Sequence, residues 1–317
     1  MVAREFDLID YYLKRHQGYS RDDVILGIGD DGAIVDLDVK QSLVVSSDSM
    51  HENVHFFQDT EPDIIGYRSL AGATSDLLAM GARPCWASLA LSMPGVDEHW
   101  LSQLCTGFNK LLKEANMQLI GGDLCRGPTS LTWQVLGQLD SDKALRRDQA
   151  QSGELLAVTG ELGGAGAYCQ YRLGQLTLPT NTAHVLQDYW AYPQLPWSLA
   201  YNIASQTNCG IDVSDGLLPD LQHITQASQV GAEVWADALP IPDLIHQHCS
   251  LDQALSLALT GGEDYQLLVT IPDTIQSIPS NLTVIGRVTA PHHKLQLLTT
   301  YGGEVLDWPQ SMFSHFN

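Results

Sequence analysis

The chain has few basic residues for its length of 317 residues. Lys and Arg together number 16, against 37 Asp and Glu, so the formal net charge is −21. A surface of this sign repels polyanions, which excludes nucleic acid and anionic membranes as partners. A phosphorylated small molecule would also be repelled, unless bound cations reversed the local sign of the field. The charge balance therefore points to a protein that uses metal ions.

Other features that the sequence lacks narrow the class of protein further. No apolar run approaches the roughly 20 residues that span a bilayer. The N-terminal MVAREFDLIDYYLKRHQ predicts an amphipathic helix rather than a signal sequence. The six cysteines contain no C-x-x-C pair, so neither a zinc site nor a short disulfide scaffold is indicated, and reduced thiols are expected. These patterns predict a soluble, cytoplasmic protein without a membrane partner.

Length and pattern predict two domains of the α/β or α+β class, because single cores stop growing at about 250 to 300 residues. Helices are expected over 62–81 and 97–116, and strands over 85–93 and 131–139. These elements do not alternate strictly enough for a doubly wound parallel sheet. The polar segment DSDKALRRDQAQSG marks the boundary and gives domains at 1–148 and 149–317.

Aspartates recur beside serine or glycine at the polar ends of apolar stretches. They are Asp30, Asp31, Asp48, Asp76, Asp123, Asp212 and Asp215. Each taken singly is typical of a helix N-cap or a turn, and that interpretation stays open. If several converge, two carboxylates about 4 Å apart would repel by roughly 4 kcal/mol at an effective dielectric of about 20. Such a cluster requires cations.

The oxygen-rich donor set favours Mg²⁺ over zinc, since no His or Cys pairs stand at ligand spacing. Mg²⁺ is commonly held by a few carboxylates together with substrate phosphates, which indicates nucleotide chemistry. The G-x-x-x-x-G-K-[ST] phosphate loop and the kinase motifs H-R-D and D-F-G are absent. Another scaffold must hold the phosphates, and we expect backbone N–H groups of TGELGGAGAY or IGGDLCRG to contribute.

Six motifs follow one another along the chain: LGIGDD, VVSSDS with a following NVHF, SDLLAMGA, LIGGD, IDVSDGL and LTGGEDYQL. In this order they resemble the thiamine-monophosphate kinase family, which shares a superfamily with aminoimidazole ribonucleotide synthetase and selenophosphate synthetase. The resemblance implies Mg²⁺-dependent transfer of the ATP γ-phosphoryl group to thiamine monophosphate, giving thiamine diphosphate and ADP. It also implies a homodimer with a β-barrel-like core built from paired N-terminal α/β domains, and a nucleotide and metal site between the two domains.

Residue by residue, the resemblance assigns three sets of site residues. The implied metal ligands are Asp31, Ser46, Ser47, Asp48, Asp76, Asp123, Asp212 and Asp215. The implied nucleotide contacts are Gly122, Arg147 and Ser214, and the implied substrate contacts are His55, Glu263 and Phe313. No general base is expected, because an acceptor phosphate is already ionised near neutral pH.

The residues themselves leave other interpretations open. His55 fits a solvated turn, and Glu263 fits a cap after two glycines. Arg147 fits an exposed ion pair with Asp148, which would contribute little stability. Phe313, near the end of the chain, also fits a side chain that fills a core.

Two departures from the family pattern stand out: Ala73 where relatives commonly have Asn, and YPQLPW where they often have R-P-x-P-R. Neither removes a carboxylate from the implied metal set.

The rival functions are another superfamily reaction, on an aminoimidazole precursor or on selenide, and a non-catalytic acidic protein that binds Ca²⁺ or a basic partner. The first cysteine is Cys85, which argues against the selenide branch, and the absence of an EF-hand loop argues against the calcium protein.

Overall fold

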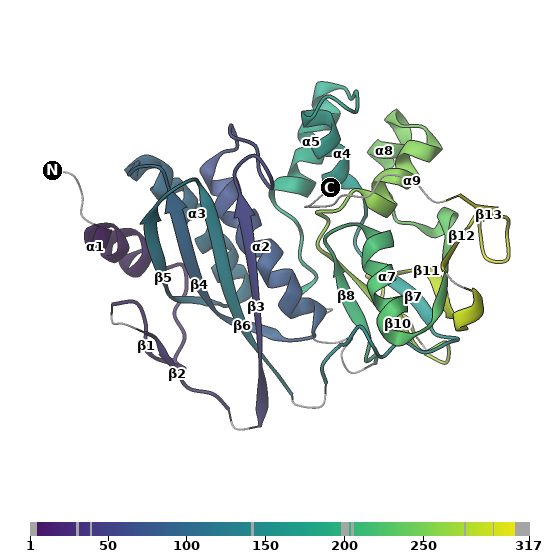
Figure 1. Ribbon diagram of the computed structural model, residues 1–317, viewed down its shortest axis with the longest axis horizontal. Helices are drawn as coiled ribbons and strands as arrows, with labels where there is room; N and C mark the ends of the chain where they lie inside the picture. The colour runs from purple at the N-terminus through teal and green to yellow at the C-terminus, as the bar shows by residue number, and fades with distance from the viewer. Residues whose placement is uncertain are drawn as a thin grey trace. The chain divides into compact units, whose positions relative to one another are not determined.

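The computed structural model describes residues 5–29, 32–38, 40–140, 143–197, 203, 206–275, 277–293 and 295–307. By its internal contacts the chain divides into two compact units (Figure 1). The first comprises Met1–Leu77 and Ala82–Asp142, and the second comprises Leu78–Gly81 and Lys143–Asn317. Within the described ranges, none of the helices combines the length and apolar character needed to traverse a bilayer.

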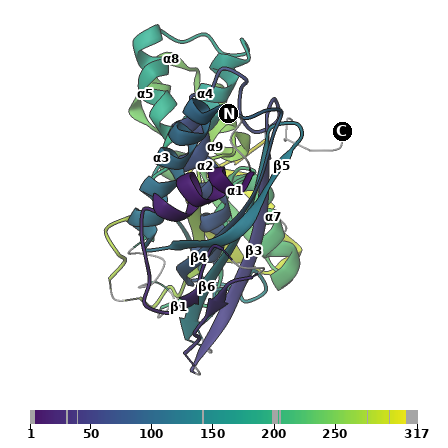
Figure 2. The same ribbon diagram turned by 90° about the vertical axis from the view of Figure 1, so that its left-hand side faces the viewer.

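A four-stranded sheet with long helices on one face forms the first unit (Figure 2). Its elements are α1 (Glu5–Leu8), the π-helical η1 (Ile9–Arg15), β1 (Val24–Leu26), β2 (Ile34–Val35), β3 (Gln41–His51), α2 (Pro62–Ala79), β4 (Arg83–Met93), α3 (Glu98–Ala115), β5 (Gln118–Arg126) and β6 (Ser130–Asp140). The strand order is β3-β6-β4-β5; β4 and β5 run parallel, and the other neighbours are antiparallel. A parallel pair needs a long crossover, which α3 supplies.

The helices begin and end where local chemistry predicts. The side chain of Asp97 accepts from the backbone N–H groups of His99 and Trp100 and caps α3, which ends at Asn116 in the left-handed conformation. The expected helices over 62–81 and 97–116 are confirmed as α2 and α3, and the expected strands over 85–93 and 131–139 as β4 and β6.

Trp133 fixes both helices to the sheet. Its side chain is 1% exposed, its Nε1 donates to Ser69 Oγ on α2 at 2.9 Å, and its ring meets Phe108 of α3 edge-on at 5.5 Å between centroids. Side chains of successive strand residues point to opposite faces of a sheet. Since Trp133 contacts the helices, the other odd-numbered residues of β6 also point to the helix-covered face. We call the opposite surface of this sheet the open face.

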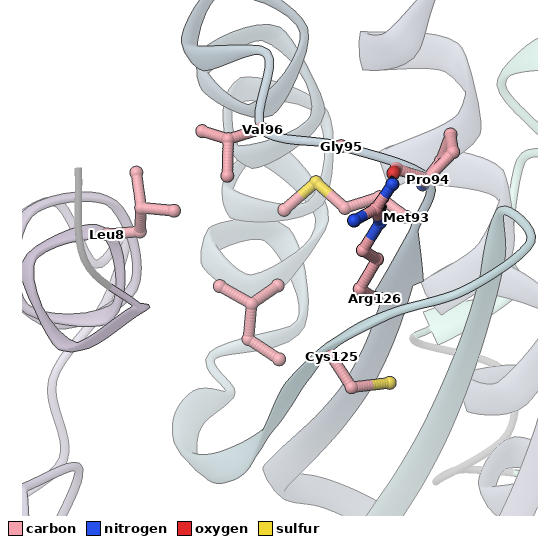
Figure 3. A pocket seen from close by; sticks show the side chains of 8 residues that line it. Leu8, Met93, Pro94, Gly95, Val96, Cys125 and Arg126 are labelled. Atoms are coloured by element: carbon pink, nitrogen blue, oxygen red, sulfur yellow. Dashed lines mark hydrogen bonds between the residues drawn. The ribbon is translucent and has the colours of Figure 1, made fainter. Parts of the chain in front are cut away.

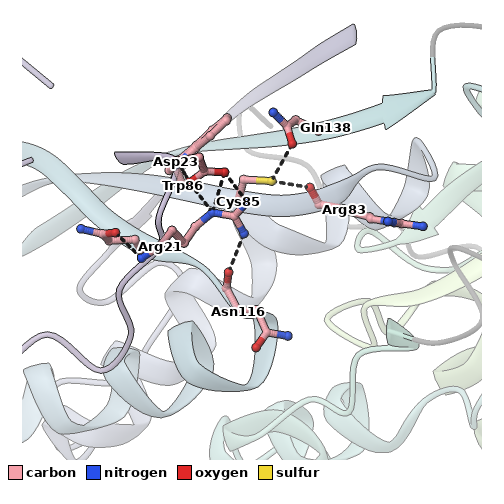
Figure 4. Close-up of polar contacts among 8 residues, drawn as sticks. Arg21, Asp23, Arg83, Cys85, Trp86, Asn116 and Gln138 are labelled. Carbon is pink, nitrogen blue, oxygen red and sulfur yellow. Dashed lines mark hydrogen bonds and ion pairs between the residues drawn. The ribbon is translucent and has the colours of Figure 1, made fainter. Parts of the chain in front are cut away.

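A polar cluster anchors the segment that leads to the GIGDDG turn (Figure 4). Arg21 pairs with Asp23 at 2.5 Å and donates to the carbonyl oxygen of Asn116 at 3.0 Å. Trp86 Nε1 donates to Asp23 Oδ1 at 3.2 Å, and the Arg21 guanidinium lies over the indole ring. The start of β1 is thereby tied to β4 and to the end of α3.

A seven-stranded sheet forms the second unit. Its elements are β7 (Leu155–Thr159), α4 (Gly164–Arg172), α5 (Thr180–Ala191), β8 (Gly210–Val213), α7 (Leu217–Ser228), β9 (Gly231–Trp235), η2 (Ala236–Ala238), α8 (Asp243–His248), α9 (Leu251–Thr260), β10 (Gln266–Ile271), β11 (Leu282–Thr289), η3 (Pro291–His293), β12 (Leu295–Leu298) and β13 (Val305–Leu306). The order is β13-β12-β9-β11-β7-β10-β8, and of these pairs only β9 with β12 is parallel.

The mixed α/β class is therefore confirmed, and so is the expectation that the fold is not a doubly wound parallel sheet. The expected dimeric barrel-like core and the domain limits 1–148 and 149–317 stay predictions.

Candidate active site

Ser46 and Asp76 meet on the helix-covered face of the first unit. Ser46 lies on β3 opposite Val135, and its Oγ donates to Asp76 Oδ2 on α2 at 2.6 Å. Asp48 lies two residues further along β3, opposite Trp133, so alternation places it on the same face. Three of the implied metal ligands thus lie between one strand and one helix.

The hydroxyl of Ser47 is on the other side of the sheet. This residue stands between Ser46 and Asp48 in β3, and its Oγ donates to the carbonyl oxygen of Trp133 at 3.2 Å. Strand alternation therefore separates its hydroxyl from that of Ser46, although the two residues are adjacent in the sequence.

Asp123 and Gly122 lie at the opposite edge of the same sheet, on β5. The strands β6 and β4 lie between β3 and β5, so Asp48 and Asp123 are roughly 14 Å apart along the sheet, at about 4.8 Å per strand. That separation exceeds what one ion with bonds of about 2.1 Å can bridge. If both residues bind Mg²⁺ within one chain, they bind different ions.

Gly122 has a backbone conformation that excludes side chains. Its φ is 150°, and a Cβ at this position would collide with the carbonyl oxygen of Leu89 on β4. The glycine thus lets β5 approach β4 closely immediately before Asp123, which is exposed.

His55 lies in the turn that follows β3. Its Nδ1 accepts from the backbone N–H of His51 at 3.0 Å, and its carbonyl oxygen accepts from the buried guanidinium of Arg68 at 3.3 Å. The side chain is half-buried and oriented by a hydrogen bond, unlike that of a freely solvated turn residue. Arg68 has no recognisable signal in the sequence, because its partner is contributed by the tertiary fold.

In the second unit, the DVSDG turn joins β8 to α7. Asp212 ends up 3% exposed within β8, whereas Ser214 is half-buried and Asp215 is exposed. The N–H groups of Ser214 and Asp215 donate to Asp220 Oδ2 at 3.0 and 3.2 Å. The turn is thereby closed by a carboxylate from the first turn of α7.

Sequence reasoning missed Asp220, although an acidic residue in the first turn of a helix is a recognisable signal. Its side chain is buried, and this burial, together with the charges of Asp212 and Asp215, raises its pKa to about 8. Asp212, Asp215 and Asp220 therefore place three mutually repelling carboxyl groups on one short segment. Cations would relieve that repulsion.

Glu263 stands beside the DVSDG turn, in the segment after α9. Its backbone N–H donates to the carbonyl oxygen of Ser214 at 2.7 Å, so the expected nucleotide and substrate residues are joined through the main chain. The conformation of Glu263 is left-handed, with φ of 66°, and its backbone N–H is engaged by Ser214 rather than by a carbonyl oxygen of α9.

Sequence reasoning also missed Asp264, whose carboxyl group lies at the N-terminus of α4. Its Oδ2 accepts from the N–H of Gly163 at 2.8 Å, and Ala165 donates to the same carboxyl group. The N–H of Leu162 donates to the carbonyl oxygen of Pro240. These three N–H groups of TGELGGAGAY are therefore engaged within the protein, whereas a phosphate contact by the rest of this segment or by IGGDLCRG stays a prediction.

Three of the implied site residues, Arg147, Asp31 and Phe313, are not among the contacts described above. Arg147 is exposed, with its carbonyl oxygen accepting from Ser228 Oγ at 2.7 Å. The alternative ion pair between Arg147 and Asp148 is wrong, since Asp148 pairs with Arg146 at 2.6 Å. Asp31 and Phe313 lie outside the described residues.

The donor set fits Mg²⁺ held jointly with phosphate. Ser46, Asp48 and Asp76 present only oxygen atoms, as does the DVSDG turn, and hard cations prefer oxygen. In the described part of the chain, no three His, Cys, Asp or Glu side chains converge as a metal cage. Mg²⁺ usually takes one or two carboxylates plus substrate phosphates rather than such a cage.

A separate, mainly apolar cavity of about 340 Å³ lies at the ends of β4 and β5 (Figure 3). Its lining residues are Leu8, Met93, Pro94, Gly95, Val96, Leu124, Cys125 and Arg126. None of the implied site residues lines it, and Arg126 Nε is occupied by the carbonyl oxygen of Pro94 at 3.1 Å.

Known proteins resemble the chain over its full length. Residues 29–139 match the family described as AIR synthase related protein, N-terminal domain. Thiamine-monophosphate kinase of Salmonella typhimurium is 38% identical over 325 residues, covering 100% of this chain and 99% of that protein. The Escherichia coli K12 enzyme of the same name is 37% identical with the same coverage.

Solved structures agree. Thiamine-monophosphate kinase from Stenotrophomonas maltophilia K279a has a TM-score of 0.83 at 38% identity, covering 94% of this chain and 97% of that one. AaThiL complexed with AMPPCP and TMP has a TM-score of 0.78 at 25% identity, covering 98% and 96%. Both the sequence and the fold therefore match over nearly the whole length, and the chain belongs to the thiamine-monophosphate kinase family.

Proposed function

We propose that this protein transfers the γ-phosphoryl group of ATP to the phosphate of thiamine monophosphate, giving thiamine diphosphate and ADP. The observation that carries the proposal is 38% identity to a thiamine-monophosphate kinase across the entire chain. The reaction is the last step of thiamine diphosphate synthesis. ATP is the co-substrate and Mg²⁺ the metal.

The proposed metal ligands are Asp31, Ser46, Ser47, Asp48, Asp76, Asp123, Asp212 and Asp215. The spacing of β3 and β5 supports more than one ion, because Asp48 and Asp123 lie too far apart along the sheet to share one. These oxygen ligands would hold Mg²⁺, which would supply positive charge to neutralise the charge that develops during phosphoryl transfer.

Gly122, Arg147 and Ser214 are the proposed nucleotide contacts. Gly122 allows close approach of the backbone, and the exposed guanidinium of Arg147 suits a phosphate in a protein of net charge −21. Ser214 is half-buried, and its backbone N–H and carbonyl oxygen are held by Asp220 and Glu263.

His55, Glu263 and Phe313 are the proposed contacts to thiamine monophosphate. The acceptor is a phosphate oxygen that is ionised near neutral pH, so the side chains need to orient it in line with the γ-phosphorus rather than remove a proton. We therefore assign no general base.

We further propose a homodimer in the cytoplasm, with residues 1–148 binding ATP and Mg²⁺ and forming the dimer, and residues 149–317 completing the nucleotide and substrate site. Apolar side chains on the open face support the dimer: Leu43 is 42% exposed and Val45 is 51% exposed, both on the edge strand β3. Contact between two such faces would cover them.

The test is direct assay of product. Purified protein with ATP, Mg²⁺ and thiamine monophosphate should yield thiamine diphosphate, detected by chromatography, whereas excess EDTA should stop the reaction. Asp48→Ala and Asp123→Ala should each lower the rate at least about 100-fold, because each removes a carboxylate proposed to hold the Mg²⁺ that offsets the phosphate charge. Unphosphorylated thiamine is the matched acceptor control. No thiamine diphosphate from the unaltered protein would refute the proposal.

A further inference from the structure

The segment Gly261–Tyr265, which contains Glu263, is held in an unusual backbone conformation. The φ angles of Gly262, Glu263 and Tyr265 are 68°, 66° and 50°. Left-handed φ is uncommon for residues with a side chain, and more so for a bulky one. Such conformations persist only where surrounding structure imposes them, and they cluster at ligand sites.

Backbone contacts with the DVSDG turn impose this conformation. Glu263 N donates to the carbonyl oxygen of Ser214 at 2.7 Å, and Tyr265 N donates to that of Val213 at 2.8 Å. Gly262 lies so close that an added Cβ would stand 2.7 Å from the Ser214 carbonyl oxygen. The two segments form one rigid assembly, although they lie some fifty positions apart in the sequence.

Within this assembly, the side chain of Tyr265 turns back onto Glu263. Its Oη donates to Glu263 Oε2 at 3.0 Å, while the tyrosine itself is 5% exposed. Glu263 is half-buried. A buried ring thus holds one oxygen of a partly accessible carboxylate, and the left-handed conformation at both residues brings the two side chains together.

We propose that Tyr265 is a positioning residue for the substrate: its hydroxyl holds the Glu263 carboxylate in the orientation that meets thiamine monophosphate. This inference rests on the proposed function, in which Glu263 contacts that substrate. A glutamate without such a bond samples several rotamers, and binding would have to order it. With the hydrogen bond from Tyr265 in place, the Glu263 side chain is already ordered before the substrate binds.

Removing the hydroxyl tests the inference. Tyr265→Phe should raise KM for thiamine monophosphate about tenfold, the usual effect of one hydrogen bond to a charged group, and leave kcat and KM for ATP within about twofold. Tyr67→Phe is the matched control, because Tyr67 is a buried tyrosine of the first unit whose Oη donates to Glu114 Oε2 at 2.8 Å. It should leave KM for thiamine monophosphate unchanged.

A double-mutant cycle separates positioning from general structural support. In a Glu263→Ala background, Tyr265→Phe should change KM for thiamine monophosphate by less than about twofold, because the carboxylate it positions is gone. An equal rise in KM in both backgrounds would overturn the inference. So would an equal rise in KM for ATP, or a loss of melting temperature without any change in KM.

The two proposals fail in different ways. If the unaltered protein makes no thiamine diphosphate, the proposed function fails and this inference fails with it. If the unaltered protein is active and Tyr265→Phe has normal kinetics, only the inference about Tyr265 is wrong.

Discussion

Single residues in this protein act through geometry that their identity does not reveal. Gly122 resembles any other glycine in the sequence, yet its φ of 150° and its closeness to Leu89 make any side chain at this position costly. Asp220 resembles an ordinary acidic residue of a first helical turn, yet its carboxylate closes the DVSDG turn. At this scale, function depends on the environment that the fold builds around each side chain.

Gly122→Ala should lower the free energy of unfolding by about 2 to 4 kcal/mol, because the added methyl group strains the backbone and collides with the Leu89 carbonyl oxygen. Urea denaturation followed by circular dichroism would measure the change. Gly95→Ala is the matched control in the same unit, since a Cβ there meets no atom within 4 Å. Equal stability of the two variants would contradict this account of Gly122.

Elements of the second unit are joined by carboxylates at their ends. Asp264 follows α9 and binds the N-terminus of α4, while Asp220 in α7 binds the turn after β8. Each contact satisfies N–H groups that a helix start or a tight turn leaves unpaired. These contacts give the site segments a defined position relative to the sheet.

The stability of this arrangement should depend on pH through Asp264. Burial raises the pKa of Asp264 from 3.8 to about 7, against the opposing effect of hydrogen bonds from Gly163 and Ala165. Between those values the folded protein keeps a proton that the unfolded chain releases. The stabilisation by Asp264 is therefore complete below about pH 4 and is lost as pH rises through about 7.

Asp264→Asn cannot titrate. The free energy of unfolding of this variant, relative to the unaltered protein, should therefore rise by about 2 to 3 kcal/mol between pH 5 and pH 8. Urea denaturation of both proteins at the two pH values would measure it. A difference that does not vary with pH would show that Asp264 has an ordinary pKa.

Two features concern the whole molecule. One is the excess of acidic residues, and the other is the exposed apolar side chains on the open face of the first unit. The net charge of −21 repels phosphorylated substrates, which supports the proposed use of Mg²⁺. The exposed Leu43 and Val45 on the edge strand β3 support the proposed homodimer.

Val45→Lys should shift the protein from dimer to monomer, because it places a charge on the edge strand that a partner would cover. Size-exclusion chromatography with light scattering gives the mass directly. Leu173→Lys serves as the control, since Leu173 is 60% exposed in the second unit. A dimer that persists in Val45→Lys would place the interface elsewhere.

Much of the fold followed from local pattern. The apolar periodicity of 62–81 and 97–116 predicted α2 and α3, and short apolar runs predicted β4 and β6, because these signals involve near neighbours in the chain. The engagement of Asp264 with Gly163 could not be predicted in this way. The partners are 101 positions apart, and only the packing of α4 against α9 brings them together.

The sequence by itself determined which chemical groups are available: an acidic chain with carboxylates beside serine and glycine, in the motif order of one kinase family. Only the tertiary structure decided which of these groups act together. Strand register put Ser46 and Asp48 on one face and Ser47 on the other, and strand order placed Asp123 at the far edge. The segment before the GIGDDG turn shows the same division, since the contacts that anchor Arg21 and Asp23 come from distant parts of the chain, at Trp86 and Asn116. Residue type is local information, whereas proximity depends on hydrogen bonding and packing between segments far apart in the chain.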